Sequence, residues 1–280
     1  MSDSQGAAAA VIEQLAAQGV SHIVISPGSR SAPLALAAWQ ADRDGLVHTY
    51  VRVDERGAGF LALGLAKSSG WPAAVVTTSG TAAGNLLPAI MEASHSQIPL
   101  IAITADRPAS WAGFGASQTT DQAKIFGGFA RWQTHISAAG DPHSWAAQAA
   151  RAVLTSRGVL GERPGPVHLN VHLSEPLAHR SDILLHRATP VLRRQSKHVE
   201  PVAFKPVRET VVICGDADPL VGAEAAGLAA ATGYPLIAEP SSNARFGAAL
   251  SCGRLVLASR LAGEVKRVVV YGHPTLSREV

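Results

Sequence analysis

Polar side chains that could bind an anion follow the first apolar run of the chain. Ser29 and Arg30 come shortly after the run that ends at Ser26, and helical sequence begins just beyond them. Exposed backbone N–H groups before a helix, together with an arginine, suit an anionic ligand. The alternative is a Pro-Gly turn with an ordinary serine cap and a surface arginine. This segment alone favours neither interpretation.

A carboxylate, Glu55, follows the next apolar run, which ends at Val53. A carboxylate at the start of a helix can simply favour the helix dipole. The helix that it begins is rich in glycine and alanine, however, and small side chains allow another backbone to approach closely. Glu55 is therefore also a candidate for a functional carboxylate at a tight interface.

A third polar turn contains Thr78, Ser79 and Gly80, and Asn85 follows one helical turn later. The turn lacks the glycine spacing of a dinucleotide loop and the Gly-Lys-Ser/Thr of a P-loop. It also lacks the Gly-x-Ser-x-Gly elbow of the α/β hydrolases. Alone, it is most simply a capped turn. Three polar turns at the same edge of one sheet are harder to explain by capping.

The fourth group is Arg107, which is followed by a long glycine-rich segment containing Gln118 and Gln122. Long irregular segments within compact domains are usually functional or disordered. Arg30 and Arg107 at one sheet edge would form a carboxylate site, because a guanidinium group can bind a carboxylate bidentately. The 11 histidines show no metal-ligand spacing, so we predict no metal site in these residues.

Alternating strands and helices must position these groups. Apolar runs predict strands at 21–26, 47–53, 73–77, 100–104 and 167–173, and periodicity predicts helices at 4–19, 32–42, 55–69, 81–94 and 144–156. This alternation indicates an α/β fold, a parallel sheet with helices on both faces. It restarts later, with predicted strands at 210–214, 235–238 and 267–271 and helices at 223–232 and 253–258.

The length of 280 residues exceeds the usual size of a single hydrophobic core, so we expect two domains. The segment 178–207 is rich in Arg, His and Pro and has no sustained period. We predict a first domain over 1–180, a linker over 181–205 and a second domain over 206–280. The second domain is incomplete, because doubly wound domains normally have five or six strands.

Composition excludes several classes of protein. Hydrophobic residues make up 47% and charged residues 16%, which is typical of a globular chain rather than a disordered one. The apolar runs are too short to span a bilayer, and the first residues contain no secretory signal. Two cysteines indicate a cytoplasmic protein without a disulfide framework. The net charge is only +3, and we interpret the one dense basic run, Arg193, Arg194 and Lys197, as a solvated linker, which argues against nucleic-acid binding.

Four motifs in order resemble the amino-terminal half of the MenD family, thiamine-diphosphate-dependent transferases of menaquinone biosynthesis. They are SPGSRSAPL at 26–34, DERGAGFLALGLAK at 54–67, TTSGTAAGN at 77–85 and TADRP at 104–108. The segment 165–170 is similar to the strand that closes the pyrimidine-binding domain of thiamine-diphosphate enzymes, and 239–242 and 272–274 are similar to turns of their central domain. The arginine-bearing turns favour MenD over acetolactate synthases and pyruvate decarboxylases.

The resemblance implies that 1–180 is the pyrimidine-binding domain and that 206–280 is part of the central domain. The diphosphate-binding domain, which holds Mg²⁺ or Mn²⁺ in the family, is absent from these residues. The activity implied for the longer protein is decarboxylation of 2-oxoglutarate and addition of the resulting succinyl semialdehyde carbanion to isochorismate. We expect the chain alone to be inactive. The longer protein is expected to be a homodimer or a dimer of dimers.

The resemblance also implies roles for individual residues. Glu55 would be the catalytic carboxylate facing N1′ of the cofactor's aminopyrimidine ring, where it favours the imino tautomer that removes the thiazolium proton. The other implied cofactor-binding residues are Thr78, Ser79, Gly80 and Asn85, and the implied substrate-binding residues are Ser29, Arg30, Arg107 and Gln118. Ser117 departs from the family, in which we expect asparagine before the glutamine.

Two alternatives stay open at this point. One is another thiamine-diphosphate carboligase or decarboxylase of acetolactate-synthase type, although a small neutral acceptor gives Arg30 and Arg107 little to bind. The other is a non-catalytic binding module on the same fold, which would have no use for the Glu55 carboxylate.

Overall fold

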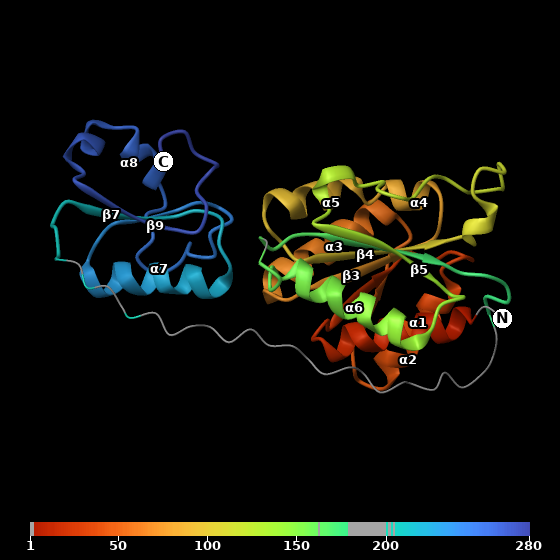
Figure 1. Cartoon of the computed structure of the whole chain (residues 1–280). Helices are drawn as coiled ribbons and strands as arrows, with labels where there is room; N and C mark the ends of the chain where they lie inside the picture. Colours follow the sequence, from red (N-terminus) through yellow and green to blue (C-terminus); the bar gives the residue numbers. More distant parts are fainter. Residues whose placement is uncertain (1–2, 162, 179–199, 201–202, 204) are drawn as a thin grey trace. The chain divides into compact units, whose positions relative to one another are not determined.

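The computed structural model describes residues 3–161, 163–178, 200, 203 and 205–280 (Figure 1). Its internal contacts divide the chain into two units, Met1–Gln195 and Ser196–Val280. The linker predicted over 181–205 lies almost entirely outside the described residues. The predicted domain boundaries therefore stay predictions, and each unit is described separately.

The first unit contains a six-stranded parallel sheet in the order β2-β1-β3-β4-β6-β5. The strands are β1 (His22–Ile25), β2 (His48–Val51), β3 (Ala73–Thr77), β4 (Leu100–Asp106), β5 (Trp132–Ser137) and β6 (Val167–His172). Strands β3 and β4 are buried at every position, as expected for central strands covered on both faces. The predicted α/β class is confirmed.

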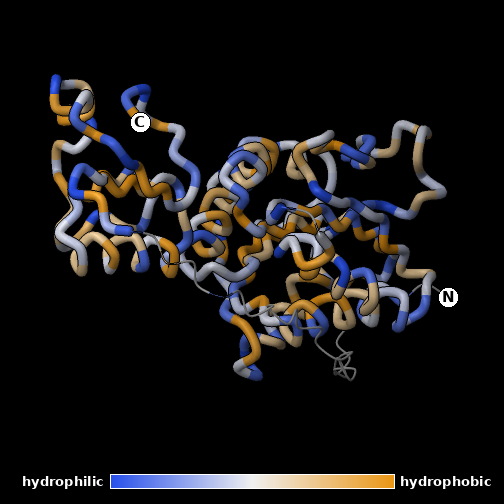
Figure 2. Tube along the Cα trace, turned by 60° about the vertical axis from the view of Figure 1, so that its left-hand side comes forward, coloured by the Kyte–Doolittle hydropathy of each residue, from blue (hydrophilic) through white to orange (hydrophobic). Residues whose placement is uncertain are grey.

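Helices cover both faces of this sheet (Figure 1). One face packs against α1 (Ser4–Ala17), α2 (Ala32–Arg43) and α6 (Pro142–Ser156), and the other against α3 (Glu55–Ser69) and α5 (Leu87–His95). Each face has its own apolar core, and Figure 2 shows hydrophobic residues in orange in the interior of the unit. Within the described part of the chain, every helix is too short or too polar to cross a membrane.

Local signals in the sequence explain where the helices begin and end. Helix α3 starts after Asp54, whose carboxylate accepts a hydrogen bond from the Gly57 N–H at 2.6 Å, and ends at Gly70, which has a left-handed φ of 69°. Helix α6 starts with Pro142 after Asp141, which caps it in the same way. These caps fix the directions in which the chain leaves the strands.

The structure differs from prediction at two places in the first unit. Strand β5 was not predicted, because it is an edge strand whose residues are mostly polar and partly exposed, so it carries no continuous apolar run. The helix predicted over 81–94 is two helices, α4 (Thr81–Gly84) and α5. Pro88 lies in the first turn of α5, where a missing N–H is tolerated, and a helix continuing from α4 would place it in the interior.

The second unit contains a three-stranded parallel sheet in the order β8-β7-β9. Its strands are β7 (Thr210–Cys214), β8 (Leu236–Ala238) and β9 (Arg267–Tyr271), and its helices are α7 (Pro219–Thr232) and α8 (Gly253–Leu257). Helix α7 packs on one face, and residues near α8 pack on the other. The three strands match the number predicted for this region.

Candidate functional site

The polar turns predicted from the sequence leave the same edge of the first sheet. Because β1, β3, β4 and β6 are parallel and paired in register, their carboxyl ends lie together. The predicted residues follow these strand ends or that of β2: Ser29, Arg30, Glu55, Thr78, Ser79, Gly80, Asn85, Arg107 and Gln118. Their shared edge agrees with the sequence-based expectation, and their roles in binding stay predictions.

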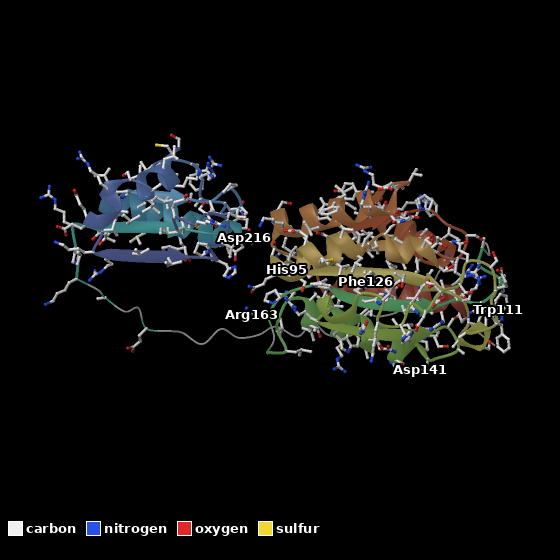
Figure 3. All side chains as sticks on the ribbon, turned by 90° about the horizontal axis from the view of Figure 1, so that it is seen from above. His95, Trp111, Phe126, Asp141, Arg163 and Asp216 are labelled. Atoms are coloured by element: carbon white, nitrogen blue, oxygen red, sulfur yellow. The ribbon has the colours of Figure 1, made fainter. Side chains whose placement is uncertain are left out.

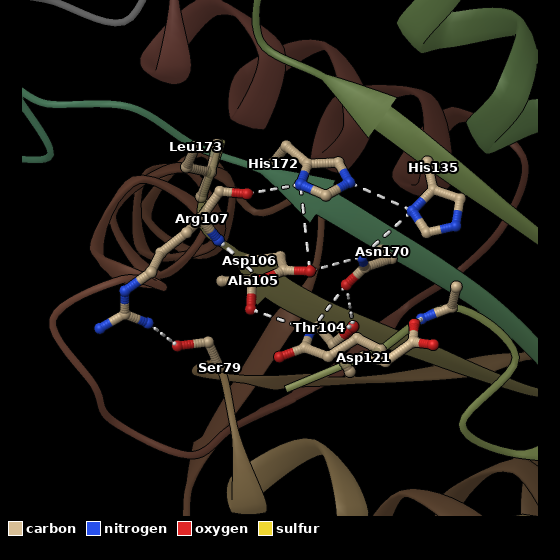
Figure 4. Close-up of polar contacts among 12 residues, drawn as sticks. Ser79, Thr104, Ala105, Asp106, Arg107, Asp121, His135, Asn170, His172 and Leu173 are labelled. Carbon is tan, nitrogen blue, oxygen red and sulfur yellow. Dashed lines mark hydrogen bonds and ion pairs between the residues drawn. The ribbon is translucent and has the colours of Figure 1, made fainter. Parts of the chain in front are cut away.

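Hydrogen bonds join Arg107, Ser79 and Gln118. The Arg107 Nη1 donates to Ser79 Oγ at 2.6 Å (Figure 4). It also donates to the Gln118 main-chain oxygen at 2.7 Å. The Gln118 side-chain amide donates in turn to the main-chain oxygen of Ser79 at 3.1 Å. Within the described residues, Nη2 of Arg107 makes no hydrogen bond, so part of the guanidinium group is available to an anion.

Arg30 is a second cation at this edge. Its Nη1 donates to the Leu173 main-chain oxygen at 3.1 Å, and its Nη2 lies 3.7 Å from a carboxylate oxygen of Glu175. Burial, followed by the positive charge of Arg107, lowers the pKa of Arg30. Two guanidinium groups that repel each other favour a bound anion, which would screen that repulsion. Ser29, next to Arg30, is exposed.

Two of the predicted turns are in close contact. A methyl group added to Gly28 would lie 2.4 Å from Cβ of Thr78, so only glycine allows the turns after β1 and β3 to approach this closely. Gly80 has a left-handed φ of 80°, and a methyl group there would lie 3.0 Å from the Gln118 side chain. The glycines thus bring the Ser29, Thr78 and Gln118 segments together.

Glu55 begins α3 and is half-buried. Its Oε2 accepts a hydrogen bond from the Asn85 side-chain amide at 3.4 Å, and no other described residue donates to this carboxylate. The carboxylate thus keeps unused acceptor capacity next to the turn that contains Thr78 and Gly80. Such a group can accept a hydrogen bond from a ring nitrogen or hydroxyl of a ligand.

A buried side-chain network lies behind the turn. Gln122 is 1% exposed, and its Oε1 accepts a hydrogen bond from the Gly80 N–H at 2.8 Å. Its Nε2 donates to Asn170 Oδ1 at 2.7 Å and to Thr104 Oγ1 and the Ala105 main-chain oxygen at 3.3 Å each (Figure 4). Gln122 therefore ties the turn to the middle of β4 and β6.

The network continues across β6. The Asn170 amide donates to Asp106 Oδ2 at 2.8 Å, and the Thr104 hydroxyl lies 2.7 Å from His168 Nε2. Burial lowers the pKa of His168 to about 3, so this imidazole is neutral at physiological pH. Phe126 meets it edge to face at 4.7 Å between ring centroids, and Figure 3 marks Phe126 within the first unit.

Sequence analysis did not identify His168, Asn170 and His172 as members of this network. The signal was present, because polar residues alternate with apolar ones along β6 in an otherwise buried strand. Period-2 alternation places all three side chains on one face of the sheet. That face is the one that packs against α3 and α5, because His168 meets Phe126 of that apolar core.

The segment between Arg107 and Gln118 extends away from this network. Trp111 and Phe114 are 46% and 82% exposed, and Figure 3 marks Trp111 at the periphery of the first unit. Ser117, the departure from the expected asparagine, is exposed. Across the described ranges no cluster of three or more metal-ligating side chains occurs.

The edge therefore combines a half-buried carboxylate, a backbone turn held by Gln122 and two guanidinium groups. Residues 6–125 match the family model described as "Thiamine pyrophosphate enzyme, N-terminal TPP binding domain". The first unit is thus similar to the N-terminal domain that this family model describes.

Several curated relatives of this chain carry the same name. The 2-succinyl-5-enolpyruvyl-6-hydroxy-3-cyclohexene-1-carboxylate synthase of Kineococcus radiotolerans is 46% identical over 291 residues, which cover 100% of this chain and 52% of the relative. The synthases of the same name from an Arthrobacter species and Thermobifida fusca are 46% and 40% identical, over 98% and 100% of this chain and 47% and 52% of theirs. The chain spans about half the length of these curated relatives, and it is similar to them along its whole length.

Proposed function

We propose that this chain is the amino-terminal part of a synthase that decarboxylates 2-oxoglutarate and joins the product to isochorismate. The observation that carries the proposal is that one sheet edge holds both the Glu55 carboxylate and the guanidinium groups of Arg30 and Arg107. A carboxylate suits activation of the cofactor, and two guanidinium groups suit substrates that carry several carboxylates. The similarity to the named synthases along the whole chain supports the same assignment.

The residues at the edge fit the pyrimidine end of thiamine diphosphate. Glu55 has free acceptor capacity, and Asn85 holds it beside a turn whose backbone is fixed by Gln122. Glu55 would accept a hydrogen bond from the pyrimidine ring, while Thr78, Ser79 and Gly80 would contact the ring through the turn. When bound, the cofactor supplies a thiazolium carbon that accepts the electron pair released by decarboxylation.

Arg30 and Arg107 would bind substrate carboxylates, with Ser29 and Gln118 supplying hydrogen bonds to carboxylate or hydroxyl oxygens. Arg107 is held by Ser79 and Gln118 on one nitrogen, which leaves Nη2 directed to other partners. A guanidinium group held in this way loses little conformational freedom when the substrate binds. The arginines thus orient the substrate rather than take part in bond making.

The remaining parts of the proposal concern the longer protein. A divalent metal, Mg²⁺ or Mn²⁺, would be held by residues beyond this chain together with the diphosphate. The assembly would be a homodimer or a dimer of dimers, in which the exposed Phe60 of α3 faces another subunit, whereas Ala58, Gly59 and Ala62 are buried in the unit's own core. We propose a cytoplasmic location, consistent with two cysteines that are not paired in the structure.

The first test uses the chain as it stands. Calorimetric titration with thiamine diphosphate and Mg²⁺ should show weak binding, because half of the cofactor would lack partners. A decarboxylation assay with 2-oxoglutarate should show no turnover. Tight, metal-dependent binding or measurable turnover would contradict this assignment of the residues.

The second test uses the longer protein. Glu55→Gln should remove most of the synthase activity, since an amide cannot exchange a proton with the ring nitrogen as a carboxyl does. Circular dichroism of the variant should match that of the parent protein. Near-normal turnover in Glu55→Gln would refute the role of this residue, and preference for pyruvate over 2-oxoglutarate would favour an acetolactate-type enzyme.

A further inference from the structure

The backbone of Arg107 is held on both sides by side chains. Its N–H donates to Asp106 Oδ1 at 2.8 Å, and its main-chain oxygen lies 2.5 Å from Nδ1 of His172 (Figure 4). Arg107 is the last element of the candidate site before the exposed segment that leads to Gln118. The position of its guanidinium group therefore depends on how firmly these two contacts fix the peptide units on either side.

The contact with the carbonyl fixes the protonation of His172. A carbonyl oxygen only accepts hydrogen bonds, so Nδ1 of His172 must carry a proton at this distance. The other ring nitrogen, Nε2, faces Nδ1 of His135 at 3.1 Å. The two imidazole rings are stacked, with centroids 5.3 Å apart and an interplanar angle of 21°.

His135 joins His172 to the buried side-chain network. Burial, followed by the nearby His172, lowers the pKa of His135, while Asp106 and Asp121 act in the opposite direction. The amide nitrogen of Asn170, which only donates, lies 3.2 Å from Nδ1 of His135, so this ring nitrogen accepts a hydrogen bond. Asn170 also donates to Asp106, so the carboxylate and the imidazole pair belong to one cluster.

We propose that His172 is a positioning residue for Arg107, and that its Nδ1–H holds the peptide that carries the anion-binding guanidinium group. The proposal rests on the proposed function, because it assigns to Arg107 the binding of a substrate carboxylate. His172 does not contact the substrate. It acts through the backbone of Arg107, whose main-chain oxygen accepts from its Nδ1.

Two variants of His172 separate this role from simple packing. His172→Phe keeps a planar ring but removes the donor. His172→Asn removes much of the ring but places an amide N–H near the position of Nδ1, so it can still donate to the Arg107 carbonyl. A packing role predicts that Phe is the better replacement, whereas a positioning role predicts that Asn is. His143→Asn, a change at an exposed histidine, is the matched control.

The experiment uses nuclear magnetic resonance of the complete 280-residue chain, labelled with ¹⁵N in histidine and arginine. We expect Nδ1 of His172 to carry a proton at pH 7.5. In His172→Phe the side-chain N–H signals of Arg107 should move toward those of a free arginine. The dissociation constant for 2-oxoglutarate should rise by about tenfold, the value for one lost hydrogen bond of ordinary strength. In His172→Asn, the Arg107 signals and the dissociation constant should return most of the way to their values in the parent chain.

Each outcome decides one of the two proposals. An Nε2–H tautomer of His172, or Arg107 signals that are the same in His172→Phe and the parent chain, overturns the positioning role. If the parent chain does not bind 2-oxoglutarate, the proposed substrate fails, while the tautomer and the Arg107 signals still test His172. If His172→Phe does not fold, His172→Gln replaces it, because its amide lies near Nε2 rather than Nδ1. A greater loss in His172→Gln than in His172→Asn supports the proposal, and equal losses contradict it.

Discussion

Both units of the chain contain a parallel sheet, but the buried polar groups near its carboxyl edge bond to different kinds of partners in the two units. In the first unit, the buried polar groups behind that edge bond mainly to other side chains, as in the cluster of Gln122, Thr104 and Asn170. In the second unit, the buried carboxylate after β8, Glu239, accepts hydrogen bonds from the backbone N–H groups of residues 275–277 at 2.9–3.0 Å. In the first unit, Glu55 and Arg107 therefore keep unused hydrogen-bonding capacity. In the second unit, the Glu239 carboxylate already accepts three hydrogen bonds.

The difference also appears in how closely the segments pack at each edge. A methyl group added to Gly215, just after β7, would lie 2.0 Å from the backbone of Pro274, so backbone fills that part of the second unit. At the first unit's edge, among the described residues, Glu55 accepts a hydrogen bond only from Asn85, and Nη2 of Arg107 has no hydrogen-bond partner. Position at the end of a strand is therefore a weak indicator of a binding site. Unsatisfied hydrogen-bonding capacity is a stronger one.

The largest expected effect on stability concerns the side-chain cluster of the first unit. Asn170→Ala removes a buried amide that bonds to Gln122, Thr104 and Asp106, and leaves their polar groups without partners. We expect a loss of about 3 kcal/mol in the free energy of unfolding. Urea titration followed by tryptophan fluorescence measures it, because all 5 tryptophans lie in the first unit.

The matched control for this prediction is Thr134→Ala on the neighbouring strand β5. Thr134 is partly buried and donates one hydrogen bond, to Gln148. Its removal should cost about 1 kcal/mol. Equal effects of the two substitutions would show that the Asn170 cluster contributes no more than a single ordinary hydrogen bond.

The same cluster predicts a pH dependence of the first unit. His168 has a pKa of about 3 in the folded state, against 6.5 as its ordinary value. Below pH 6.5, His168 thus binds a proton in the unfolded chain but not in the folded chain. The free energy of unfolding therefore falls as the pH drops from 6.5 toward 3. Between pH 7 and pH 5 the loss from this one residue is about 2 kcal/mol. The lowered pKa of His135 acts in the same direction.

Unfolding of the parent chain and of His168→Gln at both pH values measures the contribution of His168. The variant should lose about 2 kcal/mol less than the parent chain over this interval. Parallel pH dependences of the two proteins would mean that His168 does not titrate as its burial requires.

The smallest effect is expected in the second unit. Glu239→Ala removes the acceptor for three backbone N–H groups, but these belong to a partly exposed segment that water can reach. We expect a loss of about 1 to 2 kcal/mol, confined to this unit. Hydrogen exchange of the amides of residues 275–277 should accelerate, and the tryptophan-monitored transition should not move. A shift of that transition would mean that the two units do not unfold independently.

Much of the fold could be predicted from the sequence, because β3 and β4 are continuous apolar runs and α3 has a clear cap at each end. Strand β5 could not, since an edge strand needs no apolar run. The place of β6 between β4 and β5 was equally hidden, because strand order depends on long-range packing that local patterns do not record.

For the site, local turn chemistry pointed to Arg30, Glu55 and Arg107 without any contact being known. It could not reveal Gln122 as a buried link, because its sequence neighbourhood is irregular and polar. The residues of β6 were missed for another reason. The 11 histidines as a set show no metal-ligand spacing, but the alternation of His168 and His172 with apolar residues marks one face of a strand.

The close approach of Gly28 to Thr78 has a consequence for protein engineering. Any larger residue at position 28 would have to displace the threonine, so the turns after β1 and β3 interlock. A chimera that exchanges one of these turns with that of another enzyme, but not the other, would meet a steric conflict at this point. The two turns form a single module for grafting, and attempts to redesign the anion site proposed at this edge need to replace both in one step.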